Sequence, residues 1–222
     1  CMSLGIGIIT VSERVSHAAA LAQELVVAGY VSAIGGGPTL GLDEHRRGPW
    51  WNFRTTAELL AGQGHTHVCI LEDDVTLCRN FLVELSRVIT IVPTDPLSLF
   101  TARGSIVKEA DKKSTKLLRR YSLDTAQGLV FPAFMLELLC KWVDANEAAH
   151  PEWSFHGDVR IGAWSKARHW PIVHVIPNLV NHDVSLPSTL GHTGKTRYGD
   201  RVSPRFLGDT SVTSPINWGS PK

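Results

Sequence analysis

Residues 65–75 read HTHVCILEDDV, a short apolar run that is followed at once by three carboxylates. The run His67–Leu71 contains mainly apolar and β-branched side chains, which is typical of a buried strand. Glu72, Asp73 and Asp74 end that strand. Because like charges repel one another, each carboxylate raises the pKa of its neighbours. The stretch therefore predicts a strand that leads into a chemically active turn, and an ordinary solvated turn is the alternative.

Strands and helices alternate on both sides of this stretch. Strands are expected at residues 5–11 (GIGIITV), 30–34, 67–71, 97–100, 128–131 and 172–176. Helices are expected at residues 17–28, 55–61, 80–90, 132–143 and within 154–168. The alternation predicts an α/β, Rossmann-type fold whose mixed, mostly parallel sheet has helices on both faces. We expect one domain over residues 1–200 and a loop-like C-terminal tail over residues 201–222.

The composition limits the class of protein. The 22 Lys and Arg residues and 21 Asp and Glu residues give a net charge of +1, which gives no support to a large nucleic-acid surface. No apolar run approaches the ~20 residues that a membrane-spanning helix needs. The cysteines lack C-x-x-C spacing, which speaks against a zinc ribbon or a redox dithiol. We expect a cytoplasmic protein in a reducing compartment.

Polar side chains gather where the expected strands end. In a mostly parallel α/β sheet, ligands bind at the carboxyl ends of the strands, which form one rim. Neighbouring strand residues face opposite ways, so Glu72 and Asp74 share a face while Asp73 points elsewhere. Hard cations such as Mg²⁺ and Mn²⁺ bind carboxylate oxygens together with substrate phosphates. The sequence therefore predicts a divalent cation at this rim.

The HTHVCILEDDV stretch resembles the nucleotide-binding strand and DXD-type turn of GT-A-fold glycosyltransferases, including small bacterial and phage-type enzymes and transferases of the lipopolysaccharide type. The resemblance extends over about residues 5–185 in the order of elements, but only a few short stretches match in residues. It implies that Asp74 binds Mn²⁺ or Mg²⁺. It also implies that Glu72 lies towards the nucleoside and Asp73 towards the ribose or the donor sugar.

A downstream histidine completes the metal site in the family that this chain resembles. Residues 176–182 (IPNLVNH) are similar to the family's late strand, and His182 stands where that histidine is expected. A neutral imidazole is a good ligand for Mn²⁺ beside carboxylates. A surface histidine after a strand is the alternative. The metal hypothesis requires that His182 and Asp74 be neighbours in the fold.

An acid at the start of a helix is the candidate catalytic base. Asp158 follows His156 and Gly157 and opens an expected helix. In inverting enzymes of the family, a carboxylate near this place takes the proton of the acceptor hydroxyl, which implies that role for Asp158. The alternative is an ordinary helix cap, because the helix dipole stabilises an anion at this end.

Other residues are assigned to the donor by the same resemblance. The family holds the base and the ribose after the first strand and closes over the donor a little further along the chain. The residues implied are Thr10, Ser12, Arg14, Asp43, Trp51, Asn52 and Arg54. The Gly-rich tail carries Lys195, Arg197 and Arg201, which are expected to fold over the diphosphate and steady the leaving group. Plain solvation of that tail is the alternative.

The resemblance implies the transfer of a sugar from a UDP- or GDP-linked donor to an acceptor hydroxyl, with inversion if Asp158 is the base; without a base at that place, retention is the alternative. The acceptor is left open: the basic residues 108–120 suit DNA with hydroxymethylated bases or an anionic glycan, or they form a solvated loop. One rival is a phosphoesterase or nuclease, which needs further acids to hold a second metal ion ~3.5–4 Å from the first, and Asp43, Asp95 and Asp158 are the candidates. Another rival is a non-catalytic nucleotide-sugar-binding module, which does not need Asp158.

Overall fold

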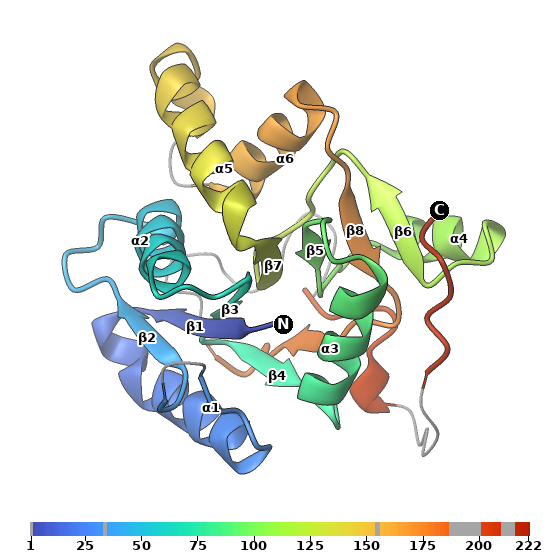
Figure 1. Ribbon diagram of the computed structural model, residues 1–222, viewed down its shortest axis with the longest axis horizontal. Helices are drawn as coiled ribbons and strands as arrows, with labels where there is room; N and C mark the ends of the chain where they lie inside the picture. The colour runs from blue at the N-terminus through green and yellow to red at the C-terminus, as the bar shows by residue number, and fades with distance from the viewer. Residues whose placement is uncertain (1, 33–34, 154–155, 187–200, 210–215) are drawn as a thin grey trace.

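A seven-stranded mixed sheet forms the centre of the protein, with the strand order β2-β1-β3-β7-β5-β8-β6 (Figure 1). The structure is a computed structural model that describes residues 2–32, 35–153, 156–186, 201–209 and 216–222. The strands are β1 (Leu4–Thr10), β2 (Thr39–Leu42), β3 (His67–Glu72), β5 (Leu97–Ser98), β6 (Leu117–Arg120), β7 (Gly128–Pro132) and β8 (Ile172–Val175). Strands β6 and β7 run against the other five. The predicted α/β class with a mixed sheet is confirmed.

Helices cover both faces of this sheet, as predicted. One face packs against α1 (Val15–Val27) and α3 (Phe81–Ile91). The other face packs against α2 (Pro49–Gly62), α5 (Ala133–Asn146) and α6 (Gly157–Ala167), which lie above the sheet in Figure 1. The two apolar clusters between these layers form one compact α/β domain. We refer to the second face as the α6 face.

The central strands β1 and β3 are buried along almost their whole length. Apolar side chains point to both faces, which is the pattern expected for strands that are covered by helices on both sides. Gly7 and Gly41 let α2 approach the sheet closely, because a Cβ atom at either position would lie within 2.5 Å of the Thr56 side chain. The close fit of α2 keeps the ends of β1 and β2 in register.

A second, two-stranded sheet brings the chain back to the rim. Strand β4 (Val75–Leu77) follows β3 after a tight turn, and it pairs antiparallel with β9 (Val180–His182). In this pairing Val75 lies opposite His182. The sequence pattern predicted neither β4 nor β9, and only the family resemblance likened residues 176–182 to a late strand.

The structure corrects two other expectations. Residues 30–32 form no strand, and the edge strand is instead β2, within the stretch that was expected to be a loop. Residues 103–120 form α4 (Gly104–Lys112) and β6 rather than the solvated loop that was one expectation for residues 108–120. Helix α4 is amphipathic: Ile106, Val107 and Ala110 are buried, while its lysines face solvent.

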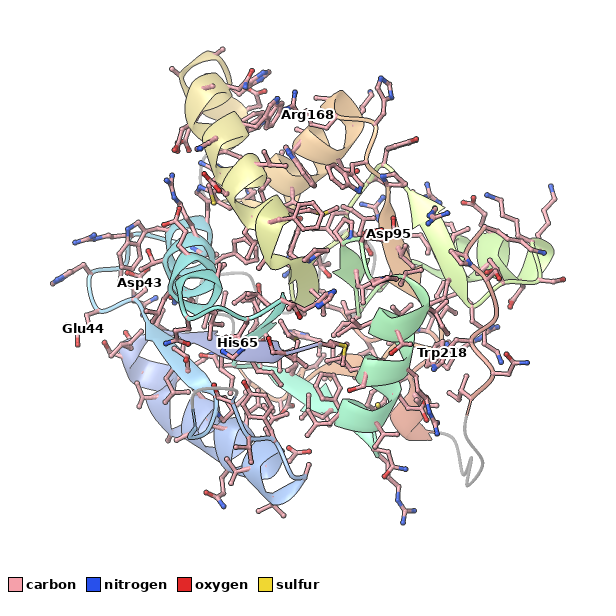
Figure 2. The ribbon with its side chains drawn as sticks, in the orientation of Figure 1. Asp43, Glu44, His65, Asp95, Arg168 and Trp218 are labelled. Carbon is pink, nitrogen blue, oxygen red and sulfur yellow. The ribbon has the colours of Figure 1, made fainter. Side chains whose placement is uncertain are left out.

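The described parts of residues 201–222 are mostly irregular, with one short 3₁₀ helix at Leu207–Asp209. They pack on the domain. The backbone of Lys222 pairs with Leu117 and Arg119 of β6, and the Trp218 indole N–H donates to Glu84 Oε2 at 2.9 Å in α3 (Figure 2). Within the residues that the structure describes, no helix combines the length and the apolar character that crossing a membrane would require.

Candidate functional site

The three carboxylates of residues 72–74 lie at the middle of the sheet. Strand β3 has β1 as its parallel neighbour and β7 as its antiparallel neighbour, so its end is enclosed on both sides. After Glu72 the chain turns sharply through Asp73 and Asp74 and enters β4. The three side chains meet different sets of partners after this turn, although Asp73 and Asp74 share Arg14.

Asp73 points towards the end of β1. Its Oδ2 accepts a hydrogen bond from the Thr10 hydroxyl at 2.5 Å, and its Oδ1 accepts one from Arg14 Nη1 at 2.8 Å. Burial raises the pKa of Asp73, although the bonds from Thr10 and Arg14 oppose that rise. Both partners are residues that the sequence assigned to the nucleotide, and the structure places them against the carboxylate turn.

Asp74 lies beside His182, as the metal hypothesis requires. Asp74 Oδ2 is 3.3 Å from His182 Nε2, although the two residues are 108 positions apart, and it also accepts from Arg14 Nη1 at 3.0 Å. The β4–β9 pairing sets this contact, and the Asp183 N–H fixes the turn by donating to the Asp74 backbone carbonyl at 2.7 Å. Burial by itself would raise the pKa of Asp74, but the hydrogen bonds from His182 and Arg14 lower it below its usual range.

The Asp74–His182 pair fits a divalent cation. Asp74 Oδ1 and His182 Nδ1 are both buried without a hydrogen-bond partner. The facing atoms, Asp74 Oδ2 and His182 Nε2, are hydrogen-bonded at 3.3 Å, so an ion held by these two atoms would take the place of that hydrogen bond. Among the described residues, no group of three or more His, Cys, Asp or Glu side chains is arranged to hold a metal. The pair therefore suits an ion that takes its other ligands from a substrate phosphate and water, as Mg²⁺ commonly does.

Glu72 faces the other way, towards α6. Burial raises the pKa of Glu72 to about 8, and the negative charges of Asp74, Asp73 and Asp158 add to that rise, while Arg201 opposes it. Asp158 and Arg201 are thus close enough to act on Glu72. The resemblance implied that Glu72 lies towards the nucleoside, whereas here Asp73 faces the end of β1 and Glu72 faces the candidate base.

Asp158 stands in the first turn of α6, as expected. Gly157 lies against the Trp50 ring, with 3.7 Å between the place of its missing Cβ and that ring, so the start of α6 packs on the start of α2. Burial raises the pKa of Asp158, although the Val159 backbone N–H and the charges of His156 and Arg201 oppose the rise. A partly buried carboxylate with a raised pKa is suited to accept a proton.

Two residues assigned to the donor hold the rim together instead. The Asn52 amide donates to the Thr10 carbonyl at 3.0 Å and to the Gly41 carbonyl at 2.9 Å, which ties β1 to β2. The Asp43 carboxylate accepts from the backbone N–H groups of Arg47 and Gly48 at 2.9 and 2.8 Å. These bonds satisfy the oxygen atoms of Asp43 and shape the loop that precedes α2.

The other assigned residues are spread around this rim. Ser12 is exposed on a 3₁₀ turn after β1. Trp51 lies under the Arg47 guanidinium, at 4.5 Å from its ring centroid. Arg54 turns to Asp144 of α5 and to Glu58, away from the three carboxylates. Lys195 and Arg197 lie outside the described residues.

No model of a known protein family matches this chain, and a search of curated proteins finds no significant match. The chemistry of the site therefore has to be inferred from its residues. The structure also adds one residue that the sequence did not point to. Gln127 lies opposite Glu72 at the start of β7, and a single glutamine before a strand gives no pattern by which it could have been found.

Proposed function

We propose that this protein is a metal-dependent glycosyltransferase that moves a sugar from a UDP- or GDP-linked donor to an acceptor hydroxyl, with inversion. The contact between Asp74 and His182, at 3.3 Å across 108 positions of sequence, is the observation that carries this proposal. The mixed sheet supports it too, because ligands of α/β sheets bind at the rim where these residues meet.

Asp74 and His182 would hold Mn²⁺ or Mg²⁺, and Thr10 and Arg14 hold the neighbouring carboxylates in place. Such an ion, when bound, neutralises a diphosphate leaving group and acts as a Lewis acid. Arg14 donates to Asp73 and Asp74, and Arg201 acts on Glu72 and Asp158, so these two cations lie among four carboxyl groups. This arrangement suits a substrate that brings its own negative charge together with the ion.

Asp158 supplies the base in this proposal. The acceptor oxygen attacks the anomeric carbon from the side opposite the diphosphate, and its proton passes to the Asp158 carboxylate. The bond from the anomeric carbon to the diphosphate oxygen breaks, and its electron pair leaves with the diphosphate. One displacement of this kind inverts the configuration, as in the inverting hydrolytic enzymes that use a carboxylate base.

The structure bears on the choice of acceptor. Three of the six basic residues at 108–120 form ion pairs: Arg119 with Asp95, and Arg120 and Lys113 both with Glu109. These pairs compensate part of the positive charge of this stretch, which weakens the case for DNA or an anionic glycan as the acceptor. We therefore favour an uncharged glycan hydroxyl.

A two-metal phosphoesterase or nuclease is supported less well. Two of the three acids that would supply a second ion are engaged elsewhere: Asp43 holds the loop before α2, and Asp95 pairs with Arg119. The third, Asp158, acts on Glu72, but without the other two it leaves a second ion with few ligands. Figure 2 places Asp43 beside β2 and Asp95 near β8, on different sides of the molecule. They do not converge on Asp74.

A screen of UDP- and GDP-sugars for metal-dependent hydrolysis tests the proposal. We expect Mn²⁺-dependent release of UDP or GDP from at least one donor, and loss of this release in Asp74→Ala. A plain oligonucleotide serves as the second substrate. Cleavage of the oligonucleotide, with no hydrolysis of any sugar nucleotide, would replace the glycosyltransferase by the nuclease.

A further inference from the structure

Gln127 and Glu72 are cross-strand neighbours. The Glu72 N–H donates to the Gln127 carbonyl at 3.0 Å, and the ladder pairs Ile70 with Leu129 and Leu71 with Gly128. One further step of this register sets Glu72 opposite Gln127. Because side chains alternate along a strand, both lie on the same side as Ile70 and Leu129, which is the α6 face. Directly opposed side chains start about 4.5–5.5 Å apart.

The Gln127 side chain is buried with an unused acceptor. Only 2% of the residue is exposed, and its Oε1 has no hydrogen-bond partner. The Thr125 hydroxyl, two residues earlier, is likewise buried and unpartnered. A leucine of similar size would fill this place without leaving a polar atom unsatisfied. A buried, unsatisfied amide in a folded protein calls for an explanation, and a ligand that supplies the missing partner is one.

The position of Gln127 and Glu72 indicates which ligand would supply the missing hydrogen bond. Glu72 is two residues from the candidate metal ligand Asp74, and the charge of Asp158 acts on it from α6. The loop before β7 runs beside α6, with the Leu123 nitrogen 3.4 Å from the place of a Gly162 Cβ. Gln127 and Glu72 thus lie between the side that would hold the diphosphate and the side that carries the base. In the proposed reaction, the transferred sugar occupies that interval.

The charges around the pair select among sugars. The Asp158 carboxyl group acts on Glu72, and Arg201 acts on both. In the proposed reaction Asp158 is ionised, so a sugar that carries a carboxylate would place a second negative charge near it. Neutral hydroxyl groups can instead donate to the Gln127 Oε1 and bond to Glu72, since both side chains accept hydrogen bonds.

We propose that Gln127, together with Glu72, binds hydroxyl groups of the transferred sugar and restricts the donor to neutral hexoses. This inference rests on the proposed function, and it goes further by assigning the sugar specificity to a residue outside the carboxylate turn. Gln127 then acts on the affinity for the glycosyl part of the donor and not on the affinity for the nucleotide.

Calorimetry with Mn²⁺ tests this division. The probes are UDP, GDP, UDP-glucose, UDP-galactose, GDP-mannose and, as the acidic sugar, UDP-glucuronate. We expect the wild-type protein to bind a neutral sugar nucleotide more tightly than the free nucleotide and more tightly than UDP-glucuronate. Gln127→Leu should lower the affinity for the neutral sugar nucleotide at least tenfold and change the affinity for the free nucleotide by less than twofold. Its thermal midpoint should equal or exceed that of the wild type.

Gln23→Leu is the matched control, because it makes the same change at an exposed site on α1. It should alter none of these affinities. The assignment of Gln127 is wrong if Gln127→Leu still binds the neutral sugar nucleotide as much more tightly than the free nucleotide as the wild type does. It is also wrong if the variant loses affinity for both equally. In either case the proposed function stands. Tighter binding of UDP-glucuronate overturns the neutral-sugar selectivity. If the wild-type protein binds no nucleotide and no sugar nucleotide, the proposed function fails, and this inference fails with it.

Discussion

Arg14 explains how three adjacent carboxylates coexist in a folded protein. Its Nη1 atom lies 2.8 Å from Asp73 Oδ1 and 3.0 Å from Asp74 Oδ2, and all three side chains are largely buried. Isolated charges in such a place would be costly, so paired and hydrogen-bonded ones are the rule. Arg14 and Thr10 satisfy Asp73 fully, whereas Asp74 keeps one oxygen without a partner. The residue that is left incomplete is the one that the metal hypothesis needs.

The role of Asp158 is open to a direct test with Asp158→Asn. General-base catalysis contributes about 10²–10⁴-fold, so we expect the transfer rate to fall by that factor while the affinity for UDP or GDP with Mn²⁺ stays within twofold. Steady-state kinetics and calorimetry on the same preparation measure the two quantities. An unchanged transfer rate would contradict the assignment, and the absence of transfer by the wild-type protein would favour the binding module.

The pH dependence of transfer follows from the same residue. Burial raises the pKa of Asp158 above that of an ordinary aspartate, ~3.9, and only the ionised form accepts a proton. The rate should therefore decline as the pH falls through this raised pKa. A pH–rate profile of the wild type should show this acid limb, and the limb should be missing in the residual activity of Asp158→Asn. A limb that persists in the variant would belong to another group.

His174 gives the fold its own dependence on pH. Burial lowers the pKa of His174, whose Nε2 donates to the Ser122 carbonyl at 2.9 Å. In the unfolded chain a histidine titrates at ~6.5, so the unfolded state binds more protons just below that pH. The free energy of unfolding should reach its full value above pH ~6.5 and should decrease as the pH falls below that value. Urea denaturation at pH 7.5 and 5.5 should show a smaller fall for His174→Gln, and an equal fall would contradict this account.

At the scale of elements, contiguous burial made β1 and β3 predictable. Both strands are apolar on two faces, and a run such as Val68–Leu71 has no other plausible place than a covered sheet. The turn after β3 was predictable for the same reason, since three charges cannot continue such a strand. The pairing of Asp74 with His182 and the role of Asp158 were implied by the family resemblance, while the helix that begins at Gly157 was expected from the sequence pattern.

Other elements had no such signal. Strand β2 is a half-exposed edge strand with the sequence TLGL, and it follows three glycines and a proline that are typical of a loop. Helix α4 buries only a narrow apolar side, and its lysines make the whole stretch look polar in the sequence. Strand β9 has three residues, and its pairing with β4 depends on the tertiary path of the chain. The role of Gln127 could not be predicted, because it depends on the pairing of β7 with β3, which places Gln127 opposite Glu72.

The sequence did not indicate that the C-terminal segment contributes to the stability of the domain. Trp218 is 3% exposed, packs in the core with α3 and donates to Glu84. Trp218→Ala should lower the free energy of unfolding by ~3–5 kcal/mol, the usual cost of removing a large buried ring. Chemical denaturation measures this, with Trp218→Phe as a milder control. If Trp218→Ala is as stable as the wild type, residues 216–222 do not pack on the domain in solution.

For the whole molecule, the sheet order creates the site. Strand β3 delivers three carboxylates to the middle of the rim, β1 delivers Thr10 and Arg14 beside them, and the chain returns after β8 to place His182 against Asp74. The α6 face adds Asp158 and Gln127 on the other side of Glu72. In the proposed reaction, the side of Asp74 and His182 would bind the metal and the diphosphate, and the side of Asp158 and Gln127 would bind the sugar and accept the proton.

Metal-dependent nucleotide binding tests this central claim most directly. Calorimetric titration of UDP and GDP, with Mn²⁺ and with chelator, should be run on the wild type, Asp74→Ala, His182→Ala and the matched control His17→Ala, an exposed histidine. The account predicts that one nucleotide binds the wild type and the control only when Mn²⁺ is present, and that both site variants lose at least tenfold in affinity. Binding that is equal with chelator, or unchanged in Asp74→Ala and His182→Ala, would contradict it.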